Sequence, residues 1–419
     1  MKKTLFLKSF LALSLIFSAK LSFAQIEFGG SLDLELSAGG KDSKWIANEI
    51  NNDFRKPHLS ISQFNLFGSA WIDDNFSVNT RMQFDTWGSG KLNNLRLSLA
   101  SLDWNSSNLP LSASLGRFIT PFGLYPRRQL SVSNPLVNMP LAYGYFVNVT
   151  PKLGLWRIAG NSGDYGDNSH TGLSTIYYGG YTTGASFNWT ILEEKMNLEV
   201  AVLNAAISAS EAYLNNTNYG FAGRLGLQPK MWWQQGFSFG YGSFMQADTL
   251  NELGFDYKDD YQMTLGTDWV LSYSYFEFSG EAIYSKWKVP TYRRGIFVTE
   301  GGEKLIEFEL ENYSFYTDLK FEPPFLSGSF ISARFEKLIF QKFDNYSTPD
   351  DRIVTQERID SGLVTKQKED WDNDVTRYSI GFGYKLSRSI LLKVAYSDQD
   401  IKNVDSDTYS FRAMLTTMF

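Results

Sequence analysis

The sequence predicts an all-β protein, a closed transmembrane antiparallel β-barrel of about 16 strands. Three observations predict it: near-continuous alternation of apolar and polar residues, connectors that alternate between short and long, and an export signal. The alternation is clearest over 76–84, where apolar residues and Thr80 occupy the even positions and polar groups the odd ones; such a period of two is typical of strands. After the first 24 residues, no segment approaches 18 uninterrupted apolar residues, so a closed barrel is the remaining way to cross a membrane.

Residues 1–24 have the features of a cleaved secretory signal. Two lysines precede the apolar stretch 5–17, and small residues stand at the −3 and −1 positions before Gln25. A transmembrane anchor is the alternative, but this apolar stretch is short and Lys20 interrupts its end. We therefore expect a signal peptide over 1–24 and an outer-membrane barrel over 25–419.

The composition excludes several kinds of chemistry. The 419 residues include no Cys and only two His, His58 and His170, and carry a formal charge of −6. The absence of Cys excludes disulfide scaffolds and thiolate zinc sites, and two His make a multi-histidine metal centre improbable on composition. An acidic chain also lacks the basic stripe of a general nucleic-acid binder. We expect no cofactor, no metal and no nucleic-acid partner.

The strands follow one another with regular spacing. In the first half we expect them near 26–36, 59–71, 75–86, 93–103, 109–118, 172–191, 196–207 and 217–228. In the second half we expect 236–246, 261–271, 275–288, 306–321, 326–340, 375–386, 390–400 and 407–419. Alternation supports the later ones directly: over 378–384 large side chains share one face and Ser or Gly the other.

The connectors orient this barrel. Short ones fall at 72–74, 105–107, 193–195, 322–324 and 387–389, and long ones include 37–58, 247–260, 289–305 and 341–374. Short periplasmic turns and long external loops are typical of outer-membrane barrels. The acidic stretch 344–374 is then a solvated external loop, with a divalent bridge to lipopolysaccharide as the alternative.

The two strand faces differ as a membrane barrel requires. One face is rich in Gly, Ser and Ala with Arg81, Arg96, Glu277 and Lys393 interspersed, which suits a wet lumen better than the outside of a soluble sandwich. Aromatic residues crowd the short-turn ends, as an interfacial girdle would: Trp71, Phe76, Trp104, Trp189, Trp232, Trp233, Tyr275 and Phe321. Trp87 and Tyr261 are thinner evidence for a second girdle.

The last strand carries an insertion signal. Phe419 ends the sequence, with Tyr409, Phe411 and Leu415 on its face. This pattern is typical of the strand through which outer-membrane barrels are recognised by the barrel assembly machinery, although Ala413 and Thr417 stand where larger residues are usual.

The longest connector, loop 119–171, is the candidate functional segment. Loops beyond about 12–15 residues are usually functional or disordered, and this one is rich in proline and aromatic residues, including Pro126, Pro140, Tyr143 and Trp156. An apolar, proline-stiffened loop must be buried, and the barrel lumen is the available place.

Here the sequence resembles a known family. The segment 115–125 resembles the "G-x-F-x-x-P-F-G-L" stretch of the phosphate-selective porin O and P family, carried here by Gly116, Phe118, Pro121, Phe122, Gly123 and Leu124. The resemblance implies a 16-stranded trimeric barrel of Gram-negative bacteria, whose motif ends a strand and opens an inward-folded loop. Phosphate-selective members line their pores with many Arg and Lys, whereas the lumen candidates here are mixed in sign.

The charged residues of the loop and wall are the candidate constriction. The loop contributes Arg127, Arg128, Lys152 and Arg157 against Asp164 and Asp167, and the wall contributes Arg81, Arg96, Glu277, Glu281 and Lys393. Basic residues at a constriction favour anions because a narrow, low-dielectric pore focuses their potential. Alternatively, Arg127 and Arg128 pair with wall carboxylates such as Glu277 or Glu281; both arrangements can hold together.

These observations predict an outer-membrane porin that passes small hydrophilic solutes or ions by passive diffusion. Its expected partners are outer-membrane lipid and lipopolysaccharide, the assembly machinery, its solutes and two further copies in a homotrimer. One alternative is a plugged barrel that serves as an adhesin or structural anchor. Another is a barrel hydrolase using His58 or His170 near the outer rim, although no Gly-x-Ser-x-Gly elbow appears. The oxygen-rich stretch 160–168 fits a calcium site poorly, because it lacks a bidentate Glu at EF-hand spacing.

Overall fold

The computed structural model describes residues 25–43, 54–85, 94–151, 154–155, 172–177, 179–192, 195–209, 219–245, 260–290, 292–293, 296–297, 299–300, 304–305, 307–347, 360–405 and 407–419. The expected signal peptide 1–24 lies outside these residues. So do several residues singled out above: Trp87, Lys152, Trp156, Arg157, 160–168 with Asp164 and Asp167, and His170.

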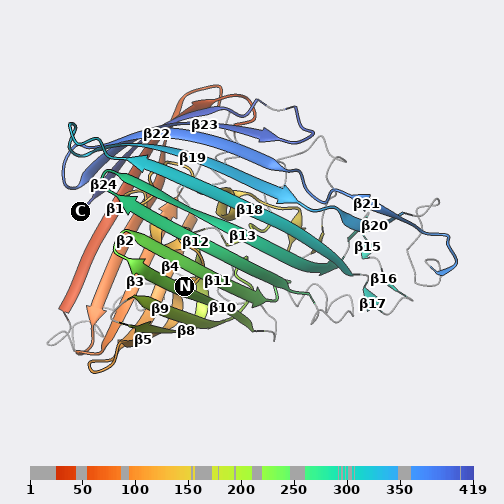
Figure 1. Cartoon of the computed structure of the whole chain (residues 1–419), viewed down its shortest axis with the longest axis horizontal. Coiled ribbons are helices and arrows are strands. Elements are labelled where there is room, and N and C mark those ends of the chain that lie inside the picture. The colour runs from red at the N-terminus through yellow and green to blue at the C-terminus, as the bar shows by residue number, and fades with distance from the viewer. Residues whose placement is uncertain are drawn as a thin grey trace, which may run out of the picture.

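Sixteen antiparallel strands form a closed barrel (Figure 1). They are β1 (Gln25–Gly39), β2 (His58–Trp71), β3 (Phe76–Asp85), β4 (Asn94–Asn105), β5 (Leu111–Ile119), β8 (Tyr181–Ile191), β9 (Met196–Leu203), β10 (Gly220–Lys230), β11 (Trp233–Gly242), β12 (Gln262–Tyr273), β13 (Phe276–Pro290), β18 (Glu307–Phe321), β19 (Ser329–Phe340), β22 (Val375–Lys385), β23 (Ile390–Ile401) and β24 (Ser410–Met418). Each pairs with the next in this order, and β1 pairs with β24, so that Ser31 lies opposite Met418. The predicted barrel is therefore confirmed.

One strand is shorter in the structure than the sequence predicted. We expected a strand over 172–191, but β8 begins only at Tyr181. Leu173 and Ile176 are instead buried in apolar clusters together with parts of the preceding loop. Their apolar character comes from this tertiary packing, which a local pattern does not distinguish from a strand.

The segments joining β13 to β18 and β19 to β22 contain additional short strands. These are β14 (Tyr292–Arg293), β15 (Ile296–Phe297), β16 (Thr299–Glu300), β17 (Lys304–Leu305), β20 (Phe343–Ser347) and β21 (Thr365–Glu369). Each pairs with its neighbour in a two-stranded sheet beyond the long-loop end of the barrel (Figure 1). Part of the stretch predicted as a solvated acidic loop is thus a hairpin, in which Lys366 and Lys368 both pair with Asp344.

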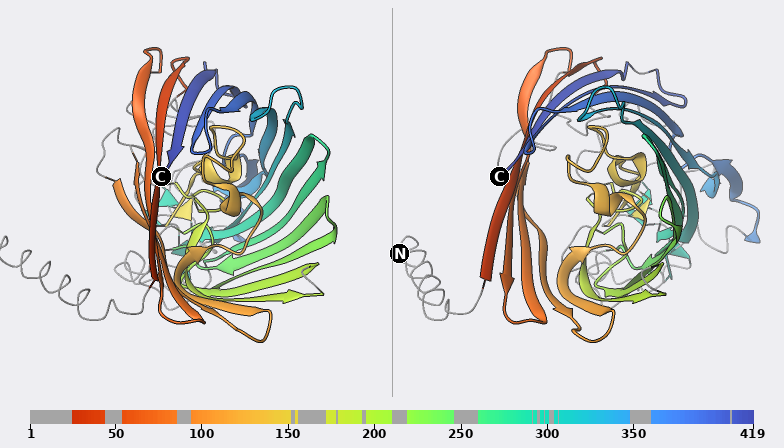
Figure 2. Two further views of the ribbon diagram at one scale, coloured as in Figure 1. Left: turned by 90° about the vertical axis from the view of Figure 1, so that its left-hand side faces the viewer. Right: turned by 60° about the vertical axis from the view of Figure 1, so that its left-hand side comes forward.

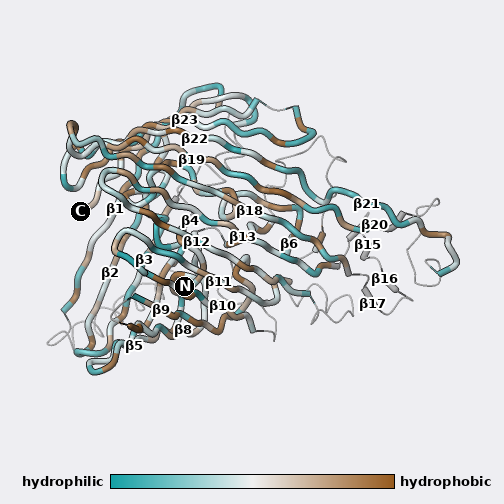
Figure 3. Tube along the Cα trace, in the orientation of Figure 1, coloured by the Kyte–Doolittle hydropathy of each residue, from teal (hydrophilic) through white to brown (hydrophobic). Residues whose placement is uncertain are grey.

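The two faces of the barrel wall have opposite character. Hydrophobic and hydrophilic residues alternate along the strands (Figure 3). Outward side chains such as Leu59, Phe221 and Ile380 are apolar and exposed, as lipid contact requires, whereas inward ones such as Arg334 and Lys393 are polar and buried. The expected aromatic residues at the short-turn ends include exposed Trp71, Trp189, Trp232 and Tyr275. No helix among the described residues is long and apolar enough to cross a membrane.

The described part of the loop between β5 and β8 lies inside the barrel (Figure 2). It contains α3 (Tyr125–Arg128), α4 (Leu141–Gly144), β6 (Val149–Thr150) and β7 (Gly154–Leu155). We call residues 120–151 of this segment the inner loop. Its distal part, including Tyr145 and Val149, packs with Trp287, Phe340 and Trp371 in one apolar cluster. A second cluster joins Phe122 and Tyr143 to the inner faces of β9 and β13.

The barrel wall requires glycine at position 116, where the inner-loop motif begins. Gly116 has φ of +123°, and an added Cβ would lie 2.3 Å from the carbonyl oxygen of Ala100 on β4. We expect Gly116→Ala to lower the free energy of unfolding by about 2–3 kcal/mol, from backbone strain and this clash together. Gly362→Ala is the control, because Gly362 has φ of +70° but nothing within 4 Å of the added atom. Urea unfolding in detergent measures both, and equal losses would contradict the clash.

Candidate functional site

The candidate site is the barrel interior, and the first question is what fixes the inner loop within it. Lys393 extends from the inner face of β23 beneath the loop and is only 2% exposed. Its ammonium group donates to the carbonyl oxygens of Ser131, Asn134 and Leu136 at 2.8, 3.1 and 3.0 Å. The sequence predicted that Lys393 lines a water path. It does not, because the loop covers it.

Three arginines extend this attachment along the wall. Each pairs with a carboxylate on the neighbouring strand: Arg334 with Asp318, Arg377 with Glu336, and Arg412 with Glu35. Arg334 and Arg412 also bind Asn138 of the loop, and Arg377 donates to the carbonyl oxygen of Met139. The carboxylates neutralise the buried guanidinium charges, and the remaining N–H groups donate hydrogen bonds to oxygen atoms of the loop. Together these contacts offset the free-energy cost of burying the charges.

Glu281 on β13 holds the beginning of the loop. It accepts hydrogen bonds from the backbone N–H groups of Leu124 and Tyr125 and from the hydroxyls of Tyr143 and Tyr316. Burial, together with the neighbouring Glu281 carboxylate, raises the pKa of Tyr143 well above its ordinary value, so its hydroxyl keeps the proton it donates. Glu281 therefore holds the loop. The sequence predicted that it lines the solute path, but, like Lys393, it is fully covered.

The family-like motif explains how the chain reaches this carboxylate. Gly123 adopts φ of +65°, and an added Cβ would lie 2.7 Å from both Glu281 Oε2 and the Tyr143 hydroxyl. The N–H of Gly123 donates to Ser238 on β11 at 3.0 Å, and Phe122 is buried beside it. The motif thus turns the chain off β5 and onto the opposite wall.

Arg127 and Arg128 are each ion-paired with the wall. Arg128 lies 2.5 Å from Glu277, as one of the alternatives anticipated, and Arg127 lies 2.5 Å from Glu199, a partner that the sequence did not suggest. The four side chains remain 22–35% exposed. Their charges therefore face the lumen as dipolar pairs.

A second set of arginines lies across the lumen from this attachment. Arg81, Arg96 and Arg117 come from the adjacent strands β3, β4 and β5, and we call them the arginine wall. Arg81 lies 5.6 Å from the ring centre of Tyr181, and Arg117 lies 5.6 Å from that of Tyr177. Each is a favourable cation–π contact. Arg81 itself is only 5% exposed and donates hydrogen bonds to Asn65 and Tyr181, so, like Lys393, it is covered and does not line the path that the sequence predicted.

The arginine wall and the inner loop approach each other at a narrow cavity of about 60 Å³. Arg96, Arg117 and Gln83 border it from the wall, and Tyr125 and Gln129 border it from the loop. None of the described residues that line it is a carboxylate. The guanidinium groups of Arg96 and Arg117 therefore supply the positive charge that borders this cavity.

Arg117 is the functional candidate that the sequence reading missed. It stands between Gly116 and Phe118 of the motif, and Leu115 two positions earlier is 62% exposed on the outer face. A strict period of two would place Arg117 outside with Leu115, yet it borders the inner cavity. The sequence-level signal is the glycine at position 116, whose positive φ in the structure interrupts the alternation there.

The inner loop is also fastened to the segment between β21 and β22. The carboxylate of Asp372 accepts hydrogen bonds from the hydroxyl of Tyr145 and the N–H of Asn148, both at 2.9 Å. Burial, with a smaller contribution from Asp374, raises the pKa of Asp372 to about 8, although the N–H groups of Asn373 and Asn148 oppose this.

This carboxyl should make the stability of the barrel depend on pH. Since the native pKa of Asp372 lies above the unfolded value, its contribution is complete only below the unfolded pKa of about 4, and it is lost progressively as pH rises to the folded pKa of about 8. We expect the free energy of unfolding to fall by about 3 kcal/mol between pH 6 and pH 9 from this group alone, with most of the fall below pH 8. Urea unfolding in detergent at both pH values should show this fall in the wild type and not in Asp372→Asn. Asp344→Asn is the control, because Lys368 and Lys366 hold the pKa of that exposed carboxyl below its ordinary value.

The structure also shows the positions of His58 and Phe419, two further residues singled out in the sequence. His58 begins β2 and packs edge-on against Phe54, with 5.1 Å between ring centres. Among the described residues, no three His, Cys, Asp or Glu side chains cluster in a way that could hold a metal ion. Phe419 pairs its backbone with Gly30, and its ring stacks on Phe64 at 6.3 Å on the outer face.

The fold is that of Gram-negative outer-membrane porins. It is similar to the anion-selective porin from Comamonas acidovorans, with 10% identity and a TM-score of 0.55 over 94% of this chain and 100% of that one. It is similar to the outer-membrane channel DcaP of Acinetobacter baumannii, with 10% identity and a TM-score of 0.54 over 96% and 99%. The trimer form of OmpT, an outer-membrane protein of Vibrio cholerae, matches with 9% identity and a TM-score of 0.51 over 94% and 99%. No protein-family model matches the chain, and no curated protein matches it in sequence.

Proposed function

We propose that this protein is an outer-membrane porin through which small hydrophilic anions diffuse passively. The observation that carries the proposal is the pair Arg96 and Arg117 of the arginine wall, which border a narrow cavity beside the inner loop whose described lining residues include no carboxylate. The fold supports it, since 16 strands enclose an aqueous channel whereas eight are filled by side chains. The similar structures include an anion-selective porin and an outer-membrane channel.

Selection would follow from size and charge. The inner loop, held by Lys393 and Glu281, narrows the lumen, and Arg96 and Arg117 set the potential of the remaining passage. A narrow passage with low-dielectric walls focuses that potential, so anions concentrate there and cations are depleted. Arg127 and Arg128, being paired, contribute less than the sequence suggested. This mechanism selects anions by charge and size and does not require a preference for inorganic phosphate over other anions.

The test is single-channel recording of the refolded protein in a planar bilayer across a KCl gradient. We expect discrete steps and a reversal potential that indicates anion preference. The double variant Arg96→Gln and Arg117→Gln should lower the chloride-to-potassium permeability ratio several-fold, whereas Arg388→Gln, in the exposed turn before β23, should not. Deleting 124–150 should raise the unitary conductance, and an unchanged conductance would remove the constriction from the proposal.

The proposal extends to targeting and assembly. Cleavage after residue 24, insertion through the strand ending in Phe419 with the help of the barrel assembly machinery, and contact with lipopolysaccharide follow from an outer-membrane location. We also propose a homotrimer, in line with the family-like motif and with the trimer form of the similar Vibrio cholerae protein. Current steps in triplets would support it.

A second function, a plugged barrel acting as an anchor or adhesin, is favoured by one observation. The apolar cluster around Trp287, Phe340 and Trp371 fills part of the lumen together with the inner loop. Silence in the bilayer from protein shown to be folded and inserted would favour this function over the porin. A hydrolase would instead require activity on lipid or peptide that His58→Ala or His170→Ala abolishes.

A further inference from the structure

The narrow cavity beside the inner loop is lined mainly by hydrogen-bond donors. Arg96 and Arg117 border it, and none of its described lining residues is a carboxylate. Gln63 and Gln83 also line it, but their side-chain oxygens already accept hydrogen bonds from other side chains of the barrel wall. A ligand that carries negative charge and acceptor oxygens fits such a lining better than a neutral solute, which needs donors and acceptors together.

Arg117 supplies a donor that still needs an acceptor. One of its terminal nitrogens, Nη1, donates to the hydroxyl of Thr183 at 3.3 Å, and its guanidinium group lies 5.6 Å from the ring centre of Tyr177. Its Nε–H is buried and donates to no acceptor among the described residues. Within the same part of the chain, Arg117 forms no ion pair with a carboxylate. Because buried N–H groups are nearly always bonded, this one indicates a place for an acceptor atom in the cavity.

The volume of the cavity limits the size of the ligand. It measures about 60 Å³, which is room for a few water molecules. Pockets for drug-sized ligands measure roughly 300–1,000 Å³. An ion of three or four heavy atoms therefore fits, whereas an aromatic acid or a sugar phosphate does not.

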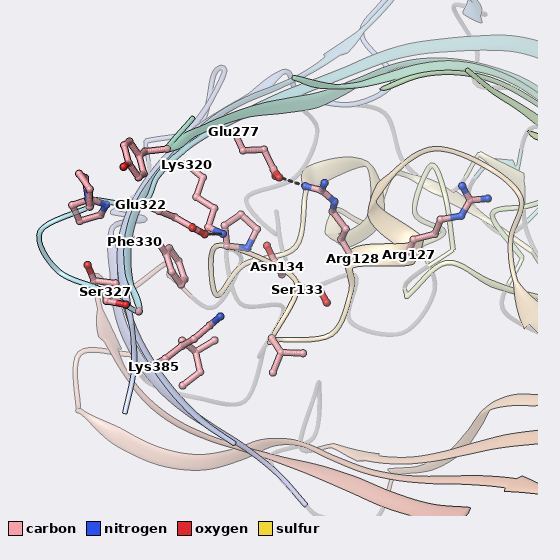
Figure 4. A pocket seen from close by; sticks show the side chains of 18 residues that line it. Arg127, Arg128, Ser133, Asn134, Glu277, Lys320, Glu322, Ser327, Phe330 and Lys385 are labelled. Atoms are coloured by element: carbon pink, nitrogen blue, oxygen red, sulfur yellow. Dashed lines mark hydrogen bonds and ion pairs between the residues drawn. The ribbon is translucent and has the colours of Figure 1, made fainter. Parts of the chain in front are cut away.

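The larger cavity at the short-turn end, of about 660 Å³, lacks this combination of features. Its lining contains both signs of charge, and Arg128 meets Glu277 at 2.5 Å there (Figure 4). Lys320 similarly pairs with Glu322 at 2.5 Å. An anion would have to compete with these carboxylates for the two cations, so the narrow cavity is the better anion site.

We propose that the narrow cavity binds a small planar oxyanion with one negative charge, such as formate, nitrate or bicarbonate. The assignment rests on the proposed function, because it makes this cavity a binding step on the anion path. A guanidinium group presents paired N–H groups that match two coplanar oxygens, a geometry that a halide cannot use. Arg117 would donate from Nε and Nη2, and Arg96 would add positive charge. The site therefore distinguishes anions by shape as well as by charge and size.

Formate binding to the refolded protein in detergent micelles tests this assignment, because saturation-transfer NMR observes the single formate proton directly. We expect nitrate to displace formate at a similar concentration. Chloride, inorganic phosphate and benzoate should each need at least about tenfold more, since chloride cannot use the paired N–H groups and the other two exceed the cavity.

Arg117→Lys separates the shape of the guanidinium group from its charge. Lysine keeps the positive charge but lacks the paired N–H groups, so formate affinity should fall at least about tenfold and the preference over chloride should largely disappear. Arg96→Lys should weaken formate binding in the same direction, and it provides the test if Arg117→Lys does not fold. Arg388→Lys is the matched control, because Arg388 lies in an exposed turn and does not line the cavity. Heat-modifiable electrophoretic mobility shows which variants are folded.

Unchanged formate affinity in folded Arg117→Lys would overturn the assignment, and so would phosphate or chloride binding as tightly as formate. Planar-bilayer conductance of the same samples in KCl reports the porin function separately. A silent barrel that binds formate refutes only the pore. A conducting, anion-preferring barrel that binds no formate refutes only this site.

Discussion

Lys393→Met should release the inner loop from the barrel wall. Methionine retains the length of the side chain but cannot donate to the three carbonyl oxygens that Lys393 now satisfies. Since buried acceptors left without donors cost about 1–3 kcal/mol each, and the nearby carboxylates of Asp33 and Glu35 lose a cation, we expect a loss of about 3–5 kcal/mol in the free energy of unfolding. The freed loop should also fluctuate, giving noisier and larger unitary currents.

Limited trypsin digestion gives this prediction a direct readout. Arg127 and Arg128 lie in α3 inside the barrel, so the folded wild type should resist cleavage there. Lys393→Met should be cut after these arginines, which yields two fragments of known mass. Lys402→Met is the control, because Lys402 makes only an exposed ion pair with Asp374. Equal protection in both variants would show that Lys393 does not hold the loop.

Glu281→Leu should have an effect of similar size at the other end of the loop. The substitution removes the acceptor for two backbone N–H groups and two tyrosine hydroxyls, all of them buried. Leucine fills much of the space but leaves four donors without this partner, and we expect a loss of about 3–5 kcal/mol in the free energy of unfolding. Urea unfolding in detergent measures the loss, and the unitary conductance should rise as residues 123–125 move from the wall.

Glu277 provides the matched comparison for this second prediction. It lies on the same inner face of β13 as Glu281, but its carboxylate is partly exposed and pairs with Arg128. Because exposed ion pairs contribute about 0–1 kcal/mol, Glu277→Leu should be far milder than Glu281→Leu. Similar losses for the two variants would mean that wall polarity in general, and not attachment of the loop, stabilises the interior.

The sequence was enough to predict the barrel because the residue pattern of each strand reflects the surroundings of its two faces. Lipid on one side and a polar interior on the other impose a period of two, and the short turns separate successive strands. The motif from Gly116 to Leu124 likewise marked where the inner loop begins, since its two glycines adopt positive φ at that point. The exception was the stretch 172–177, where Leu173 and Ile176 are apolar because they pack inside the barrel and not because they belong to a strand.

The sequence also suggested some of the charges that face inward, such as Glu277, Glu281 and Lys393, but not what each of them does. Alternation assigns a side chain to a face; it carries no information on whether another segment covers that face. Only the tertiary structure places Lys393 and Glu281 beneath the loop, joins Arg127 to Glu199 from a distant strand, and brings Arg117 to the inner cavity. These outcomes depend on contacts between residues far apart in the chain, where burial and hydrogen-bond satisfaction decide the partner. The fold was determined by local pattern, and the role of each interior charge by the path of one loop through the lumen.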